Sequence, residues 1–225
     1  MVKFLCDGII FDCDGVLLNS NALKTEAFRK ILTAYPQDIV ARFIDYHQTN
    51  GGISRYVKLR TFFTDFLATS VDETELTELL AAFGRCCRQL YQTAALTPGC
   101  LTVLEQLSSC IPLYVASGSD QTELQEVFAQ RGLDKYFQEI YGSPKTKQEC
   151  VAEIVAKFDS DSSLLMVGDA ESDWQAATKA GINFIFMAGF SDAADLMRTK
   201  AQTADFPIIE TLESLLPSLN LLVHN

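Results

Sequence analysis

Four short runs of apolar residues most strongly limit how this chain can fold. Each run is nearly continuous in Ile, Leu, Val, Phe or Tyr, which is typical of strands that are buried on both faces. Stretches with the spacing of helices lie between the later runs, and this alternation favours a parallel α/β sheet. The predicted strands are Gly8–Phe11, Ile111–Ala116, Ser163–Val167 and Ile182–Met187, and the helices between them are Asp120–Gln130, Thr146–Phe158 and Glu171–Ala180.

A long helical segment interrupts this pattern after the first strand. Residues from about 21 to 95 contain no convincing strand, and Thr97-Pro98-Gly99 is a turn signal where the chain returns to the sheet pattern. The simplest architecture is an α/β core of residues 1–18 and 96–225 with an all-helical insertion of residues 19–95. We expect insertion helices at Ala22–Ala34, Asp38–His47, Tyr56–Ala68 and Asp72–Ala94, and a short helix with a frayed tail at Thr211–Asn225.

The composition argues against several classes of protein. The chain has 18 Lys and Arg against 29 Asp and Glu, a net charge of −11, which disfavours nucleic-acid binding through a basic face. No apolar run approaches the roughly 20 residues of a membrane helix, and the first residues do not resemble a signal peptide. The seven cysteines are an odd number, so we expect free thiols and a cytoplasmic location.

Two pairs of acidic residues follow predicted strands. Asp12 and Asp14 come after the first strand, with Gly15 permitting a sharp turn, and Asp169 and Asp173 come after the third. In open α/β sheets, ligands bind beyond the carboxyl ends of the strands. Carboxylates that converge there repel each other unless a cation is present, so the pairs indicate a divalent metal site. Taken singly, each pair is also compatible with a polar turn or an acidic helix N-terminus.

Two further segments could bind an anion at the same edge of the sheet. Ser117 and Gly118 follow the second predicted strand and could supply a hydroxyl and backbone N–H groups at a helix N-terminus. Lys145 and Lys147 precede another predicted helix, and one of them could neutralise a phosphoryl group. Taken singly, the first segment is equally an ordinary turn and the lysines are equally exposed surface residues.

In this order along the chain, the motifs resemble those of the haloacid dehalogenase-like hydrolase superfamily. The match consists of Asp12-Cys13-Asp14-Gly15-Val16, Ser117, a loop lysine and Gly168-Asp169 with Asp173, and it covers nearly all of the chain outside the insertion. The insertion resembles the helical cap of this superfamily, in the branch of phosphoglycolate phosphatase and beta-phosphoglucomutase. The resemblance implies a Rossmann-like parallel sheet core flanked by helices, with an inserted all-helical cap domain.

The resemblance also implies the roles of the acidic residues. Asp12 matches the nucleophile that forms an aspartyl-phosphate, and Asp14 matches the general acid that protonates the leaving oxygen and later activates water. The implied cofactor is Mg²⁺. Its ligands would be the Asp12 carboxylate, the backbone carbonyl of Asp14, Asp169, and Asp173 either directly or through water.

The phosphate-binding residues follow from the same resemblance. Ser117, with Gly118, matches the hydroxyl segment that binds the transferring phosphoryl group. Lys147 fits a Ser-Pro-x-x-Lys form of the lysine motif, and Lys145 is the second choice. Cys13, between the two catalytic aspartates, is interpreted as a packing residue, with sensitivity of the site to oxidation as the alternative.

Asp14 favours phosphoryl transfer, because dehalogenases of this superfamily lack that aspartate. Phosphonate hydrolysis in the superfamily uses a cap lysine that forms an imine, and the sequence around Lys24 and Lys58 does not favour this role. We therefore predict a phosphoric monoester hydrolase that acts on a small phosphorylated metabolite. The alternative is a phosphomutase of the same fold, and a dehalogenase or a non-catalytic binding module is disfavoured. The chain is expected to be a monomer or homodimer.

Within the insertion, two adjacent glycines precede a short basic segment. Gly51 and Gly52 permit close backbone approach, and Arg55 and Lys58 follow on one helical face. Our hypothesis is that Asn50, Arg55 and Lys58 contact the leaving group of the substrate through a carboxylate or second anionic group. The alternative is an ordinary turn followed by an exposed basic helix.

Overall fold

A parallel six-stranded sheet forms the centre of the computed structural model, which describes residues 4–220. Its strand order is β4-β3-β2-β5-β6-β7, and every neighbouring pair is parallel. A separate parallel pair joins β1 to β8. The Rossmann-like α/β fold is thereby confirmed. The strands are β1 (Phe4–Leu5), β2 (Gly8–Phe11), β3 (Leu113–Asp120), β4 (Glu139–Ser143), β5 (Leu164–Gly168), β6 (Asn183–Met187), β7 (Ile208–Ile209) and β8 (Leu219–Asn220).

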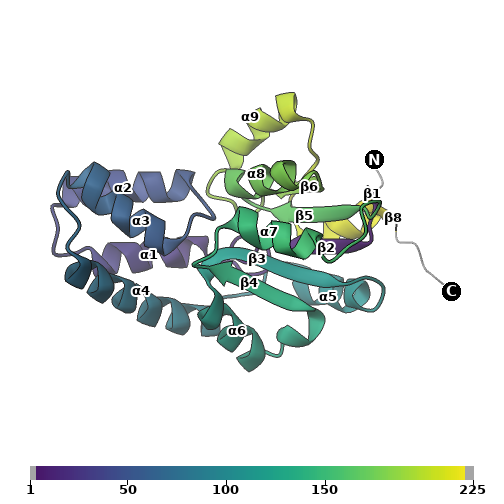
Figure 1. Ribbon diagram of the computed structural model, residues 1–225, viewed down its shortest axis with the longest axis horizontal. Helices are drawn as coiled ribbons and strands as arrows, with labels where there is room; N and C mark the ends of the chain where they lie inside the picture. The colour runs from purple at the N-terminus through teal and green to yellow at the C-terminus, as the bar shows by residue number, and fades with distance from the viewer. Residues whose placement is uncertain (1–3, 221–225) are drawn as a thin grey trace.

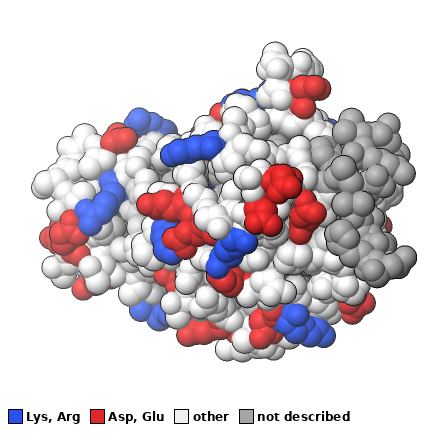
Figure 2. Space-filling model, turned by 45° about the vertical axis from the view of Figure 1, so that its right-hand side comes forward, with Lys and Arg blue, Asp and Glu red and all other residues white. Residues whose placement is uncertain are grey.

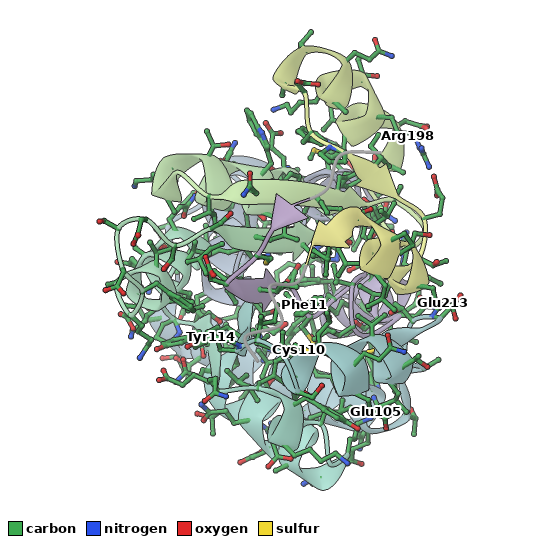
Figure 3. The ribbon with its side chains drawn as sticks, turned by 90° about the vertical axis from the view of Figure 1, so that its right-hand side faces the viewer. Phe11, Glu105, Cys110, Tyr114, Arg198 and Glu213 are labelled. Atoms are coloured by element: carbon green, nitrogen blue, oxygen red, sulfur yellow. The ribbon has the colours of Figure 1, made fainter. Side chains whose placement is uncertain are left out.

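Helices cover both faces of this sheet (Figure 1). Successive strand residues point to opposite faces, so Ile9 and Phe11 join one buried apolar cluster with α5 and α6, and Ile10 joins another with α7, α8 and α9. Viewed along the molecule, Phe11 lies inside, whereas Glu105 and Arg198 lie at the edge (Figure 3). The helices flanking the sheet are α5 (Cys100–Ser108), α6 (Gln121–Gln130), η2 (Asp134–Tyr136), α7 (Lys147–Val155), α8 (Glu171–Ala180), α9 (Ala194–Ala204) and η3 (Leu212–Ser218).

The remaining helices form a block beyond the carboxyl ends of the strands, at the left of Figure 1. Its interior is aromatic: the ring centroids of Phe28 and Phe83 lie 4.1 Å apart, and those of Phe43 and Phe62 lie 5.0 Å apart. The backbone N–H of Asn19 donates to the carbonyl of Ala95, so the outgoing and returning segments run side by side. The helical block comprises α1 (Asn21–Ile31), α2 (Gln37–Thr49), α3 (Arg55–Thr61), η1 (Phe62–Phe66) and α4 (Glu73–Thr93).

Several elements differ from the sequence-based expectation. Strand β4 was not predicted, because Glu139 and Gly142 interrupt its apolar run, and α5 and α9 were also missed. The expected helix Tyr56–Ala68 is α3 followed by η1, a π-helical segment, and Ala68 ends it with a φ of 53°. The expected C-terminal helix is the 3-10 helix η3, followed by β8, and the part of the predicted tail at 221–225 lies outside the described residues.

The exterior carries charged side chains of both signs, which are interspersed on the face drawn in Figure 2. None of the helices in the described part of the chain is long and apolar enough to cross a membrane. All seven cysteines are free thiols.

Candidate active site

Strand register brings the predicted motifs to one edge of the sheet. Phe11 of β2 lies opposite paired residues of both β3 and β5. Asp12, Ser117 and Asp169 follow these paired positions by one or two residues, so they meet where the three parallel strands end. This is the edge at which open α/β sheets bind ligands.

Three carboxylates gather at this edge. Asp12, Asp169 and Asp173 each place one oxygen within 4.8 Å of the others, and all three side chains are buried. Burial raises the pKa of Asp12 to about 7, although the nearby Lys147 ammonium opposes the shift. Burial, together with repulsion from Asp12, also raises the pKa of Asp169. Because one ammonium does not balance three carboxylates, the donor set fits a divalent cation that prefers oxygen ligands.

The two candidate lysines lie in different surroundings. The Nζ atom of Lys147 lies 2.9 Å from Asp12 Oδ2 and also donates to Asp173 Oδ1, and its side chain is buried. Burial alone would lower the pKa of Lys147, but the two carboxylates raise it. Lys145 instead makes a half-exposed ion pair of 2.6 Å with Glu153. Of the two, only Lys147 is brought to the acidic cluster.

Ser117 and Gly118 lie in the second half of β3, at the same edge of the sheet. Ser117 is fully buried, and its Oγ accepts a hydrogen bond of 3.1 Å from the backbone of Ser119. Gly118 has no room for a side chain, because a Cβ there would lie 2.1 Å from the carbonyl oxygen of Gly52 in the helical block. The glycine therefore permits the helical block to touch the site.

Asp14 is held by four donors. Its Oδ1 accepts hydrogen bonds from Ser20 (2.6 Å) and Tyr91 (2.8 Å), and its Oδ2 accepts from Lys24 (2.7 Å) and Ser119 (2.9 Å). Burial would raise the pKa of Asp14, but Lys24 and these hydrogen bonds lower it to about 2. Four side-chain donors therefore take the place of water around the buried Asp14 carboxylate.

None of these four donors was predicted to support Asp14. Two polar residues of α1 could have been found from their spacing: Asn21 and Lys24 are three residues apart and therefore lie on one face. Lys24 reaches Asp14, and Asn21 Nδ2 donates to Asp169 Oδ2 at 2.7 Å. Tyr91 and Ser119 lie far from Asp14 in the sequence, and no local pattern marks them.

The residues predicted to contact the leaving group are only partly brought together. Arg55 and Lys58 line a cavity of about 30 Å³ that also touches Asp12 and Asp14. Arg55 is already paired, because its guanidinium donates at 3.0 and 2.7 Å to the two carboxylate oxygens of Glu123 on α6. Asn50 does not line this cavity, and its amide donates to the carbonyl of Tyr46 at 2.9 Å.

The segment Gly51–Gly52 covers the site from the helical block. Ser172 Oγ donates to the Gly51 carbonyl at 2.9 Å, and Gly52 has a φ of 74°. A larger groove of about 270 Å³ lies on the outer side of this segment and includes Lys147. Gly51 and Gly52 line both spaces, so they separate the inner cavity from the groove.

Cys13 lies between the two catalytic candidates and is fully buried. Burial raises the pKa of its thiol well above the ordinary value. Because the thiolate is the reactive form, this environment favours the predicted packing role over a redox role.

The comparison with protein families identifies the enzyme class. A family model described as haloacid dehalogenase-like hydrolase matches residues 6–181, which is most of the chain. The chain belongs to this family. The prediction of a hydrolase is thereby confirmed. No curated protein matches the chain.

Solved structures of this family share the fold over nearly the whole length. A predicted phosphatase from Clostridium acetobutylicum is 18% identical, with 94% of this chain and 97% of that one covered and a TM-score of 0.74. A predicted phosphoglycolate phosphatase from Haemophilus somnus is 19% identical (94% and 97% covered, TM-score 0.70). The HAD-hydrolase YfnB from Bacillus subtilis, solved with magnesium, is 19% identical (97% and 100% covered, TM-score 0.69).

Proposed function

We propose that this protein is a Mg²⁺-dependent phosphatase that hydrolyses a small phosphorylated metabolite through an aspartyl-phosphate on Asp12. The observation that carries the proposal is the buried cluster of Asp12, Asp169 and Asp173 around Lys147, with Asp14 beside it, in a chain of the haloacid dehalogenase-like family.

The metal-binding residues of this proposal are Asp12, the backbone carbonyl of Asp14, Asp169 and Asp173. Three buried carboxylates with one ammonium suit a hard divalent cation. When bound, Mg²⁺ would offset the negative charge of the phosphoryl oxygens and of these carboxylates. Magnesium in the structure of YfnB supports this choice of metal.

Asp12 is suited to attack phosphorus. The backbone N–H of Cys13 donates to Asp12 Oδ1 at 2.7 Å, which fixes the orientation of the carboxylate. One Asp12 oxygen forms a bond to phosphorus while the bond from phosphorus to the leaving alcohol oxygen breaks. Water then attacks the phosphorus of the aspartyl-phosphate, which releases inorganic phosphate and restores the carboxylate. Ser117, Gly118 and Lys147 would hold the phosphoryl oxygens.

Asp14 is suited to move the protons of both steps. It would donate a proton to the leaving oxygen in the first step and take one from the attacking water in the second. Ser20, Tyr91, Lys24 and Ser119 fix its position. In this state Asp14 is held as the carboxylate, so it must gain a proton when substrate binds.

The helical block acts as a cap in this proposal, with residues 19–95 as the cap domain and 1–18 and 96–225 as the core. The inner cavity of about 30 Å³ is small for a phosphate ester, so in this proposal the block moves when the substrate binds. The magnesium-bound structure of YfnB reveals interdomain movement in that protein, which supports a moving cap here. We also propose a cytoplasmic location and a monomeric or homodimeric state.

The test is phosphate release from a panel of phosphorylated metabolites, with Mg²⁺ and with EDTA. Wild-type protein should release phosphate only with Mg²⁺, and Asp12→Asn should lose about 10³-fold or more of the activity. Asp7→Asn is the matched control, because Asp7 lies at the other end of β2, where it accepts from the backbone of Ser163.

Release that persists in Asp12→Asn would contradict the proposed nucleophile. Folded, Mg²⁺-loaded protein that converts a sugar phosphate to an isomer without releasing phosphate would show a mutase instead.

A further inference from the structure

Three basic side chains of the helical block line the inner cavity, and two of them have a carboxylate partner. Lys24 pairs with Asp14 at 2.7 Å, and Arg55 pairs with Glu123 at 2.7 Å. Lys58 is different. Among residues 4–220, no carboxylate oxygen lies within 4.0 Å of its Nζ atom.

Lys58 is nevertheless one of the most deeply buried polar residues, with 2% of its surface exposed. Its Nζ atom contacts His47 twice, at 2.8 Å from Nδ1 and at 3.1 Å from the backbone carbonyl. An ammonium group has three donors, so these contacts leave one donor available. The charged groups that face it are Asp14, Asp192, Lys24 and Lys147, and burial lowers the pKa of Lys58.

The fold gives no reason to bury a lysine here. The surrounding helical block is aromatic, and the Phe28 ring packs against the His47 ring that contacts Lys58, with centroids 4.6 Å apart and planes tilted by 58°. A buried ammonium without a counter-ion is strongly disfavoured relative to an ammonium in water. An apolar residue would pack at this position without that penalty, so the amine is best explained by a negative group that arrives with a ligand.

The place of Lys58 in the cavity limits which part of the ligand it can meet. The proposed nucleophile Asp12 and the phosphoryl-binding Gly118 line this cavity from the core, whereas Lys58 lines it from α3 of the block. The leaving group must therefore extend from the core side towards Lys58. Phe28, Phe83 and Ile53 line the same cavity, which favours a short leaving group.

We propose that Lys58, positioned by His47, is a specificity-determining residue that binds a second anionic group on the leaving alcohol of the substrate. The substrate class is then a small phosphate monoester that carries a carboxylate or a second phosphate within a few bonds of the ester. This inference rests on the proposed phosphatase function. Of Asn50, Arg55 and Lys58, which the sequence-based hypothesis places at the leaving group, it keeps only Lys58 in that role.

The test measures binding of three unreactive phosphonates to the Mg²⁺-loaded full chain by calorimetry. Propylphosphonate carries one anionic group, 3-phosphonopropionate adds a carboxylate, and propane-1,3-diylbisphosphonate adds a second phosphonate. Each is measured with the wild type, with Lys58→Met, and with Lys157→Met as the matched control. Lys157 is a half-exposed lysine that pairs with Glu139 away from the site.

The wild type and Lys157→Met should bind one of the two doubly anionic ligands at least tenfold more tightly than propylphosphonate. Which of the two is preferred distinguishes a carboxylate substrate from a bisphosphate. Lys58→Met should lose this preference and bind propylphosphonate within about twofold of wild type. If the preference is absent from the wild type, or survives in Lys58→Met, the inference is wrong. Should Lys58→Met fail to fold, Lys58→Gln provides the same comparison.

Turnover separates this inference from the function on which it rests. If binding shows a preference that depends on Lys58 but the corresponding esters release no phosphate, the second-anion site is supported and the proposed phosphatase function is contradicted. Phosphate release with no such preference would contradict the second-anion site alone. With a second-anion ester, Lys58→Met should raise KM tenfold or more and change kcat by only a few-fold.

Discussion

Two aspartates that lie two residues apart show how strongly local contacts decide the behaviour of one residue type. Asp12 and Asp14 are both buried, and burial by itself would raise the pKa of each. Asp12 has one ammonium beside it and two further carboxylates, and its pKa rises to about 7. Asp14 accepts from four donors that include Lys24, and its pKa falls to about 2. The proposed roles need the reverse, an ionised Asp12 and a protonated Asp14. A cation bound at the acidic cluster would lower the pKa of Asp12, and a phosphoryl group beside Asp14 would raise its pKa.

His47 makes the stability of the protein depend on pH. Burial, together with the neighbouring Lys58, lowers the pKa of its imidazole to about 2. The unfolded state therefore takes up a proton below about pH 6.5 that the folded state does not. The stabilisation by the neutral imidazole is complete above pH 6.5 and decreases as the pH falls, by at most about 1.4 kcal/mol per pH unit.

The free energy of unfolding should therefore decrease from about pH 7 to 5 more steeply in the wild type than in His47→Asn, when both are measured by urea denaturation. The lowered pKa of Lys58 also makes the free energy of unfolding decrease as the pH falls, and it does so in both the wild type and His47→Asn. Parallel curves for the two proteins over this range would show that folding does not lower the pKa of His47.

At the scale of single elements, the segment between α2 and α3 matters most for the site. Gly52 has a φ of 74°, and a Cβ there would lie 2.1 Å from Ser172 Oγ and 2.8 Å from Lys147 Nζ. Gly132, after α6, has a φ of 64° and nothing within 4 Å of its Cβ position. The two glycines therefore share the backbone conformation and differ in their contacts.

We predict that Gly52→Ala lowers kcat/KM for phosphate release by about tenfold or more, because the added methyl group displaces Ser172 and Lys147. Gly132→Ala should lose about 1 kcal/mol of unfolding free energy, since alanine strains a left-handed backbone, and Gly52→Ala should lose at least as much because neighbouring atoms must also move. Kinetics and urea denaturation of both variants test this. Equal kinetics in the two variants would show that the Gly51–Gly52 segment does not shape the site.

At the scale of the whole molecule, a buried ion-pair network joins the helical block to the core. Glu123 of α6 receives Arg55 of α3 at 3.0 and 2.7 Å and Arg88 of α4 at 3.1 Å. Tyr56 adds a hydrogen bond of 2.8 Å to Asp120. These contacts lie where the core and the block meet, so they hold the block against the core.

Glu123→Gln should destabilise the protein by about 3 kcal/mol, because it leaves the buried Arg55 without a counter-charge. It should also increase the radius of gyration in X-ray scattering as the block opens. Glu73→Gln is the matched control, since Glu73 pairs with Arg60 on the surface at 2.7 Å, and it should change neither quantity measurably. An unchanged radius for Glu123→Gln would contradict the role in closure.

The apolar runs and the acidic residues that follow them were enough to predict the parallel α/β fold and the acidic edge of the sheet. Both are local signals: a strand buried on two faces needs a continuous apolar run, and a site at its carboxyl end must follow that run directly. Asp12 and Asp169 could therefore be placed from their neighbours in the chain. Strand β4 escaped because Glu139 and Gly142 break the pattern that marks the other strands.

The groups that surround these residues could not be predicted, because they come from distant parts of the chain. Lys147 and Lys145 differ by two positions, yet one is buried between carboxylates and the other pairs on the surface. Tyr91 reaches Asp14 across 77 positions of the chain, and Arg55 reaches Glu123 across 68. Contacts of this range depend on how the helical block packs on the sheet, and no periodicity or spacing in the sequence records that packing.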